Sequence, residues 1–224
     1  MPAALRRRAG RPSEGVLTRE LILVTALKVL NRLGPDKFTL AALADELGVK
    51  TPALYHHVGG KSDILAGMRE YVTQGIDTSA FGVLPWPEAV MSWARSYRSA
   101  FAAHPYAIAL LATLPVTGAE QTLQMYERTA RGFRGAGWPE EDVVNTIVAL
   151  ENFILGSALD AVAPEDMFDT GGFADQVPVF DAAVRVRHSA AGTAGSAAEQ
   201  AFELGLAAMV EGLEARRKAL AAGE

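Results

Sequence analysis

The chain contains no cysteine among its 224 residues, which excludes a disulfide framework, a thiolate metal site and a cysteine nucleophile. It also lacks long hydrophobic runs, since no uninterrupted apolar stretch approaches the roughly 20 residues that a membrane-spanning helix needs. The basic cluster at residues 6–8 is followed by no apolar h-region, so no signal peptide is predicted. We therefore expect a cytoplasmic protein without membrane contact.

Signatures of catalysis are missing as well. The sequence has no G-x-S-x-G, no H-E-x-x-H and no glycine-rich phosphate loop. Asp160, Asp166 and Asp169 are better explained as the start of a solvated loop than as a cation site. We expect no enzymatic activity, no cofactor and no bound metal, and an enzyme with an accessory helical hairpin is a remote alternative.

Strand-length alternation is absent, whereas apolar residues recur at helical spacing along most of the chain. Half of the residues are hydrophobic and the mean hydropathy is only +0.12, as in a globular protein long enough to bury a core. The expected fold is all-α. The spacings predict helices over residues 18–33, 39–47, from 50–52 onward, 61–72, 88–104, 107–114, 120–136, 139–159 and 199–221, with a short one near 180–186 inside a partly mobile 162–198 segment.

Charge is divided unevenly between the two parts of the chain. Residues 1–75 carry 11 basic and 7 acidic side chains, a net charge of +4. Residues 76–224 carry 10 basic and 19 acidic side chains, a net charge of −9. A basic N-terminal part on an acidic remainder suits a DNA reader attached to a domain with another task. A non-specific architectural DNA protein, the second alternative, would need a basic body.

Residues 39–61 have the pattern of a helix-turn-helix. Apolar residues at i, i+3, i+4 and i+7 from Leu40 give a two-turn helix one buried face, and Thr39 stands at its N-cap. Gly48 follows the last apolar position, where a left-handed residue ends a helix. Pro52 falls in the first turn of the second helix, where a missing N–H costs nothing. A second helix of this kind enters the DNA major groove.

The outward surface of that second helix separates a DNA reader from an ordinary helical hairpin. A solvated helix normally mixes both charge signs, but residues 50–61 contain no carboxylate. Leu54 and Val58 are needed in the core, which leaves a surface of hydrogen-bond donors. These donors are Lys50, Thr51, Tyr55, His56, His57 and Lys61.

Two C-terminal helices, over residues 143–159 and 202–213, are too apolar for a single layer. Pairing them with their copies in a four-helix bundle would bury the excess in a homodimer. The alternative is that both face the core of one monomer. A dimer is favoured because a lone helix-turn-helix reads few base pairs.

One dense pattern identifies a resemblance: F-T-x-x-x-[LI]-A-x-x-L-G-V-x-x-x-x-[LF]-Y-x-H-[FV]-x-x-K-x-x-[IL]-L. By this pattern the chain resembles the TetR family of bacterial repressors, and in its details the tetracycline-repressor branch. Segments 153–160 and 201–214 look like the dimer helices of that branch, and the likeness is weakest across 162–198. The pattern is carried by Phe38, Thr39, Leu43, Ala44, Leu47, Gly48, Val49, Leu54, Tyr55, His57, Val58, Lys61, Ile64 and Leu65.

The resemblance implies roles for the residues of the hairpin. Thr39, Tyr55, His57 and Lys61 would anchor it on the phosphate backbone. Base edges would face the first part of the second helix, beside Lys50, because base contacts specify a site whereas phosphate contacts position the protein. The base-facing residues would be Thr51, Pro52, Ala53 and His56. Thr51 and His56 replace a glutamine and a tryptophan of the branch, so the operator sequence is open.

The effector site departs further from the branch. Leu110 and Asp160 stand where the branch has a histidine and a glutamate that help to hold a magnesium–tetracycline complex, and leucine cannot ligate a metal. We therefore expect an aromatic or apolar effector other than tetracycline. Trp93 and Tyr97, four residues apart on one helix, either stack on a flat ligand or are ordinary core aromatics. The implied effector-binding residues are Asp77, Trp93, Tyr97, Leu110, Thr113 and Asp160.

These inferences define a division of the chain and a function. We expect a flexible basic arm (1–15), a helix-turn-helix domain (16–62), a connecting helix (63–76) and a helical effector-binding and dimerisation domain (77–224). The expected protein is a homodimeric repressor of transcription that binds double-stranded operator DNA and is released by a small molecule. A regulator that responds to no ligand is the alternative.

Overall fold

A computed structural model describes residues 17–190 and 195–222. Within these ranges the chain is helical, with no strand beyond one isolated bridge between Phe81 and Leu84, and the expected all-α fold is confirmed. The basic arm expected over residues 1–15 lies outside the described residues. The elements are α1 (Arg19–Leu33), α2 (Leu40–Glu46), α3 (Thr51–Leu54), α4 (Lys61–Thr73), α5 (Trp86–Ala102), α6 (Pro105–Ala112), α7 (Glu120–Gly135), α8 (Glu140–Asp160), a 3-10 helix η1 (Gly171–Gln176), α9 (Pro178–Ala190) and α10 (Ala197–Ala222).

The N-terminal module is built from α1, α2 and α3, and its helices begin and end where the sequence predicts. The hydroxyl groups of Thr18 and Thr39 accept hydrogen bonds from the backbone N–H groups of Leu21 and Ala42, each at 3.1 Å, and so cap α1 and α2. Gly48 has a φ of 67°, the left-handed conformation expected for the residue that follows α2.

A continuous apolar core holds this module together. Phe38, Leu43 and Leu54, from the loop before α2, from α2 and from α3, are fully buried in it. Ala44 is buried at the turn between α2 and α3, where its carbonyl accepts a hydrogen bond from the N–H of Val49 at 3.0 Å. The helix-turn-helix geometry therefore follows from the apolar spacing and the turn glycine together.

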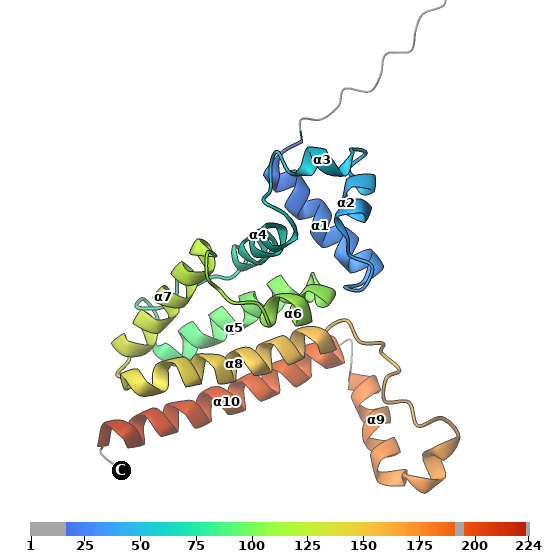
Figure 1. Cartoon of the computed structure of the whole chain (residues 1–224). Coiled ribbons are helices and arrows are strands. Elements are labelled where there is room, and N and C mark those ends of the chain that lie inside the picture. Colours follow the sequence, from blue (N-terminus) through green and yellow to red (C-terminus); the bar gives the residue numbers. More distant parts are fainter. Residues whose placement is uncertain (1–16, 191–194, 223–224) are drawn as a thin grey trace, which may run out of the picture.

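Helix α4 carries the module on the rest of the molecule (Figure 1). Its Asp63 accepts two hydrogen bonds from the Arg19 guanidinium of α1, both at 2.7 Å. Gly67 lies so close to α1 that a Cβ atom there would stand 2.7 Å from Leu23 Cδ2. The Leu23 side chain packs directly on the backbone of α4 at this point, so α1 and α4 are closely packed against each other.

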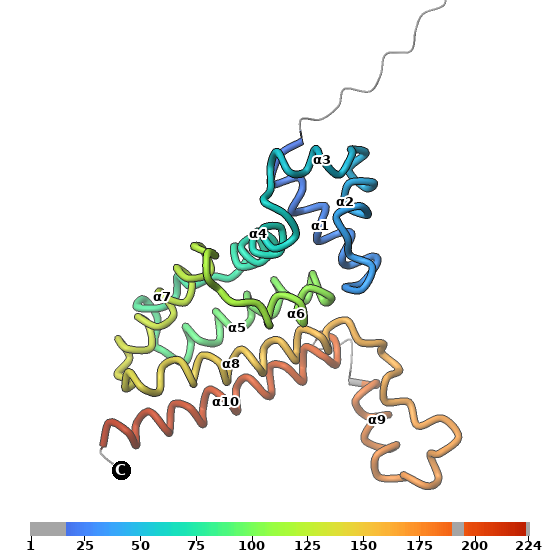
Figure 2. Tube along the Cα trace, in the orientation of Figure 1, coloured from blue at the N-terminus to red at the C-terminus, as the bar shows by residue number. Residues whose placement is uncertain are grey.

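The C-terminal body is a layered bundle in which α5, α8 and α10 lie side by side, with α6 and α7 between them and α4 (Figures 1 and 2). A glycine in α10 permits a close approach to α8. A Cβ atom on Gly205 of α10 would lie 2.7 Å from the Phe153 ring of α8. The rings of Phe153 and Phe202 stack at this crossing with centroids 5.6 Å apart.

The segment between α8 and α10 contains more helix than the sequence predicted. In place of a short helix near 180–186, α9 runs from Pro178 to Ala190 and projects away from the bundle with η1 beside it (Figure 1). Asp181 in its first turn and Arg187 in its last turn complement the helix dipole, which accounts for the added turns. Residues 191–194 of the segment lie outside the described part.

Helix α8 alone among the described helices is long and apolar enough to span a membrane. Its contacts place one side of it against the bundle, because it packs against α5, α6, α7 and α10. It also buries the carboxyl group of Glu151, and its first turn carries three acidic residues. We therefore treat α8 as a core helix.

Candidate DNA interface and effector domain

The recognition segment consists of α3 and the helical turn that follows it to His57. Leu54 and Val58 are buried beneath it, and the backbone N–H of His57 donates to the carbonyl of Leu54 at 2.9 Å. The prediction that Leu54 and Val58 lie in the core is confirmed. Their burial determines which face of the segment is exposed.

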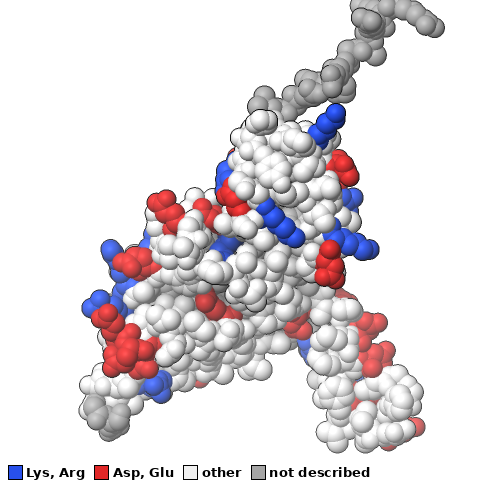
Figure 3. Space-filling model, in the orientation of Figure 1, with Lys and Arg blue, Asp and Glu red and all other residues white. Residues whose placement is uncertain are grey.

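The free face presents the donors that the sequence singled out. Lys50, Pro52, Tyr55, His56 and His57 are exposed, and Tyr55 retains 57% of its accessible surface. Thr51 and Ala53 are half-buried. In the view of Figure 3, the tip of the molecule formed by α2 and α3 is largely uncharged, with a few basic and acidic side chains around it. Hydroxyl and imidazole groups therefore make up most of the surface that we expect to face DNA.

Two of the expected phosphate anchors also hold the fold. The exposed Thr39 uses its hydroxyl oxygen as the cap of α2 and keeps its O–H available as a donor. Lys61 Nζ donates to the Phe38 carbonyl at 3.0 Å and lies 5.5 Å from the centroid of the Phe38 ring. This contact holds the ammonium group in one place on the surface beside α2.

Two adjacent residues of α4 form hydrogen bonds with the connection between α6 and α7. Arg69 is buried and donates to the carbonyls of Leu111, Leu114 (2.6 Å) and Pro115 (2.8 Å), at the C-terminal end of α6. Glu70 Oε1 accepts a hydrogen bond from the backbone N–H of Gln121 at 2.8 Å, in the first turn of α7. A cation thus meets the negative end of one helix dipole and an anion the positive end of the next.

The DNA-binding module and the body touch at a second point. Asn31 of α1 donates from Nδ2 to the carbonyl of Ala103 at 3.1 Å, and the same amide lies 3.1 Å from His104 Nδ1. Burial lowers the pKa of His104, so the neutral imidazole that accepts this hydrogen bond is favoured. The module is therefore held to the body both by α4 and by the end of α1.

A buried polar group lies at the centre of the body. The Tyr97 hydroxyl of α5 donates to Glu151 Oε1 of α8 at 2.9 Å. Burial raises the pKa of Glu151, although hydrogen bonds from Tyr126 and Tyr97 oppose this effect. Burial, with the neighbouring Glu151 charge, raises the pKa of both Tyr97 and Tyr126. A carboxyl group among phenols in this position can accept hydrogen bonds from a polar ligand or attract a cation.

Trp93 and Tyr97 are packed core aromatics in this conformation. Both are buried, and their rings meet edge to face with centroids 5.4 Å apart. The indole Nε1 of Trp93 is buried and has no acceptor among the described residues. A buried hydrogen-bond donor without a partner is costly. A ligand with a suitable acceptor atom would therefore be stabilised by a hydrogen bond from this indole N–H.

The other expected effector residues do not converge on one cavity. Asp77 borders a groove at the end of α4, and its carboxylate accepts a hydrogen bond from the backbone N–H of Ser79 at 2.8 Å, which lowers its pKa. Leu110 and Thr113 lie at the end of α6, where the Thr113 hydroxyl donates to the Ala109 carbonyl at 3.0 Å. Asp160 borders a separate recess beside α9.

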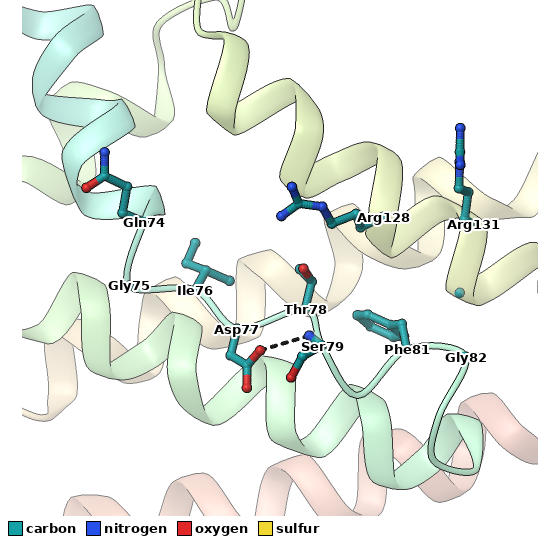
Figure 4. Close-up of a pocket in the computed structure, with 11 residues that line it drawn as sticks. Gln74, Gly75, Ile76, Asp77, Thr78, Ser79, Phe81, Gly82, Arg128 and Arg131 are labelled. Carbon is teal, nitrogen blue, oxygen red and sulfur yellow. Dashed lines mark hydrogen bonds between the residues drawn. The ribbon is translucent and has the colours of Figure 1, made fainter.

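The groove at the end of α4 is shown in Figure 4. It has a volume of about 670 Å³, within the range of small-molecule sites. Its walls are the non-helical segment after α4 and one face of α7. The lining residues are Gln74, Gly75, Ile76, Asp77, Thr78, Ser79, Phe81, Gly82, Arg128, Arg131 and Gly132.

Sequence reasoning missed Arg69, Phe81, Arg128 and Glu151. A signal existed for Glu151, a carboxylate in the middle of the apolar 143–159 helix. The sequence carried no local signal for the others, because their roles depend on which helices meet. Among the described residues, no group of three or more His, Cys, Asp or Glu side chains is arranged to hold a metal ion.

The fold and these sites define a class of protein: a helix-turn-helix module joined by one helix to a helical domain of ligand-binding type. Comparison with known proteins agrees. Residues 22–68 match the family profile "Bacterial regulatory proteins, tetR family", and residues 84–217 match "Tetracyclin repressor-like, C-terminal domain". The chain belongs to the TetR family of transcriptional regulators.

Individual relatives lie in the same family. The class A tetracycline repressor protein of transposon 1721 from Escherichia coli is 32% identical over 200 residues, which cover 88% of this chain and 90% of that protein. A solved structure of a possible TetR family regulator from Streptomyces coelicolor A3(2) superposes with a TM-score of 0.71 and 27% identity, over 88% of this chain and 98% of that one. Streptomyces coelicolor ActR in complex with actinorhodin superposes with a TM-score of 0.67 and 26% identity, over 91% and 99% of the two chains.

Proposed function

We propose that this protein is a cytoplasmic, homodimeric repressor that binds an operator through α3 and leaves it when a small molecule binds the body. The observation that carries the proposal is that Arg69 and Glu70 of α4 both form hydrogen bonds with the connection between α6 and α7. Through α4, these contacts connect the exposed donors of the recognition segment to a domain that holds a groove and a buried polar cluster. The relative ActR has been solved in complex with a small molecule, actinorhodin.

The mechanism is a shift between two conformers. An effector that binds better to the conformer with misplaced recognition helices must weaken operator binding, and the operator must weaken effector binding by the same factor. In a dimer, the two copies of α3 have to enter major grooves about 34–36 Å apart. A small rotation of α4 in each copy is enough to lose this match.

The proposed effector differs from magnesium–tetracycline. The side chain of Leu110 has no atom that can bind a metal ion. Asp160 and Asp77 border two separate recesses. Release by an organic molecule without a metal is the outcome that these positions favour. Loss of the operator complex only when Mg²⁺ and tetracycline are both present would contradict this part of the proposal.

A DNA selection experiment tests the reading surface. From a random library, the wild-type protein is expected to enrich a two-fold symmetric site with half-sites one helical turn apart. Thr51→Ala and His56→Ala should change the enriched bases, each with a cost of about 1–3 kcal/mol at its own base pair. Tyr55→Phe removes only a hydroxyl group that is proposed to contact phosphate. This change should weaken binding to all DNA sequences by the same factor and leave the preferred site unchanged.

Two outcomes would overturn the assignment. Enrichment of no sequence by the wild-type protein would show non-specific binding, which is strongly salt-dependent and blind to sequence. An unchanged preferred site in both Thr51→Ala and His56→Ala would show that another surface reads the bases. Asp36→Ala, an exposed change in the loop before α2, is the control for effects unrelated to the recognition segment.

A further inference from the structure

We propose that the groove between residues 74–82 and α7 binds a planar aromatic anion, whose ring takes the place of the Phe81 ring and whose acidic group pairs with Arg128. This inference rests on the proposed function, because it names the chemical class of the effector. It is carried by four features of the groove: a cation, a seat for a flat ring, a buried donor beside that seat, and a direct attachment to α4.

The cation is Arg128. Its side chain extends from α7 toward the segment opposite (Figure 4), and among the described residues no ion pair or hydrogen bond engages its guanidinium group. Arg131, one turn further on, points away from the groove in the same view and donates to Glu127 at 2.5 Å. The Asp77 carboxylate points away from Arg128 and is held by Ser79. Within the described residues, the groove therefore presents the guanidinium group of Arg128 without an acidic partner, and this group can pair with an anion.

The seat is formed where Phe81 lies against Gly132. A Cβ atom at position 132 would stand 2.5 Å from the Phe81 ring, so the glycine leaves room for a flat group pressed on α7. Phe81 is half-buried and belongs to the non-helical segment between α4 and α5. Its ring centroid lies 6.0 Å from that of Phe133 and 6.3 Å from that of Trp93. A ligand ring in this seat would keep the same aromatic neighbours.

The unpaired donor belongs to the ring behind the seat. The indole N–H of Trp93 is buried and meets no acceptor within the described ranges, as is also true of Trp86 and Trp138. Of these three rings, Trp93 is the one that contacts Phe81, with ring centroids 6.3 Å apart. A carbonyl or hydroxyl oxygen on the ligand ring would satisfy this donor and remove the cost of leaving it unpaired. The chemistry of the site thus calls for an oxygenated aromatic ring with one negative charge.

The groove is attached directly to the helix that carries the DNA-binding module. Its wall from Gln74 to Ile76 continues from the last residue of α4, and Gly75 packs on Ala100 of α5, where an added Cβ would lie 3.2 Å from the Ala100 Cβ. When the ring of a bound ligand takes the place of the Phe81 ring, the 74–82 segment has to move. The end of α4 is the only covalent continuation of that segment toward the DNA-binding module.

A pair of fluorescent probes tests the charge preference on the full chain. Anilinonaphthalene sulfonate is an aromatic anion, and N-phenylnaphthylamine has the same ring system without the sulfonate group. We expect the sulfonate to bind the wild-type protein more tightly. Arg128→Gln should weaken sulfonate binding about tenfold and leave the uncharged probe unaffected, whereas Arg131→Gln, the matched control on the same helix, should change neither. Phe81→Ala should strengthen binding of both probes, because the seat is then empty.

The same proteins separate this inference from the proposed function. Equal binding of the two probes, or equal effects of Arg128→Gln and Arg131→Gln, would overturn the assignment of the groove whatever happens at the operator. Where binding depends on Arg128, the selected operator is added. Weaker operator binding with the sulfonate supports both proposals, and unchanged operator binding supports the groove while it contradicts effector-driven release. Circular dichroism melts confirm that each variant is folded, because the sulfonate probe also binds loosened states.

Discussion

At the scale of single residues, Glu151 is the group whose chemistry the fold changes most. Its carboxyl group accepts a hydrogen bond from Tyr97 inside the body, away from water. Burial raises its pKa in the folded chain, while the unfolded chain has the ordinary value. The folded state therefore binds more protons between these two pKa values. Stability falls as pH rises through this interval and is constant above it.

Glu151→Gln removes this dependence and keeps an acceptor for Tyr97. We expect the variant to be more stable than the wild-type protein at neutral pH, by on the order of 1–2 kcal/mol, with the difference vanishing below the ordinary glutamate range. Thermal or urea unfolding between pH 4 and pH 8 measures this difference. Glu165→Gln, at an exposed position, is the control and should give a difference that does not vary in this way. A pH-independent difference for Glu151→Gln would show that folding leaves the pKa of the carboxyl group unchanged.

At the scale of helices, the sequence predicted existence and position well. Proline and acidic residues at the start of α8, threonine caps at α1 and α2 and glycine after α2 are local signals that mark where these helices begin or end. Of these, Thr39 and Gly48 act as predicted. The close crossing at Gly205 was predictable because glycine inside a helix requires a reason. Trp93 and Tyr97 were correctly placed on one face of one helix. The length of α9 was underestimated, since its exposed apolar side chains give weak periodicity.

The relations between helices were beyond the sequence. In the sequence, nothing distinguishes Arg69 and Glu70 from other charged residues on the surface of a helix. Their hydrogen-bond partners depend on the approach of α4 to the α6–α7 connection. Phe81 and Gly132 are about fifty residues apart, and nothing local marks them as a ring and its seat. Residues that a fold brings together from separate elements have no signal in one sequence, whereas caps and turns do.

The grip of α4 on α7 gives a prediction at this scale. Glu70→Ala should cost about 1 kcal/mol of stability, as for loss of a helix cap, and should loosen α4 relative to the body. The chain has no cysteine, so Asp45→Cys at an exposed position of α2 takes a single spin label per copy. In the proposed dimer, the label-to-label distance distribution should broaden in the Glu70→Ala background. Its mean should stay close to that of the parent.

The control is Glu120→Ala, which removes a carboxylate from the same end of α7 without touching α4; its partner is Gln124 of its own helix. This change should leave the distribution as narrow as in the parent. An equally narrow distribution after Glu70→Ala, with lower stability, would show that Glu70 caps α7 and does not hold the position of α4.

At the scale of the whole molecule, one face of the body is too apolar for contact with water. Val144, Val148 and Leu159 of α8 and Leu204 of α10 are exposed, Leu204 by 75% and Val144 by 66%. The spacing of the first three places them on one side of α8, away from the residues that it buries. Apolar patches of this kind mark contact surfaces, and α10 lies beside α8 along its length (Figure 2). These two helices are the pair for which the sequence predicted a four-helix contact.

Charge substitution on this face tests the proposed dimer. Val148→Arg and Leu204→Arg each place an unpaired charge in the proposed contact, where its desolvation has no compensation. Size-exclusion chromatography with light scattering should give a mass of two chains for the wild-type protein, and the variants should dissociate at concentrations at least 100-fold higher. Val83 lies in the loop before α5, outside this face, and is at least as exposed as Val148 and Leu204. The Val83→Arg variant should therefore remain dimeric. A two-chain mass for both interface variants would place the contact elsewhere. If they are monomeric and folded, they should also lose the symmetric operator, because one copy of α3 spans a single half-site.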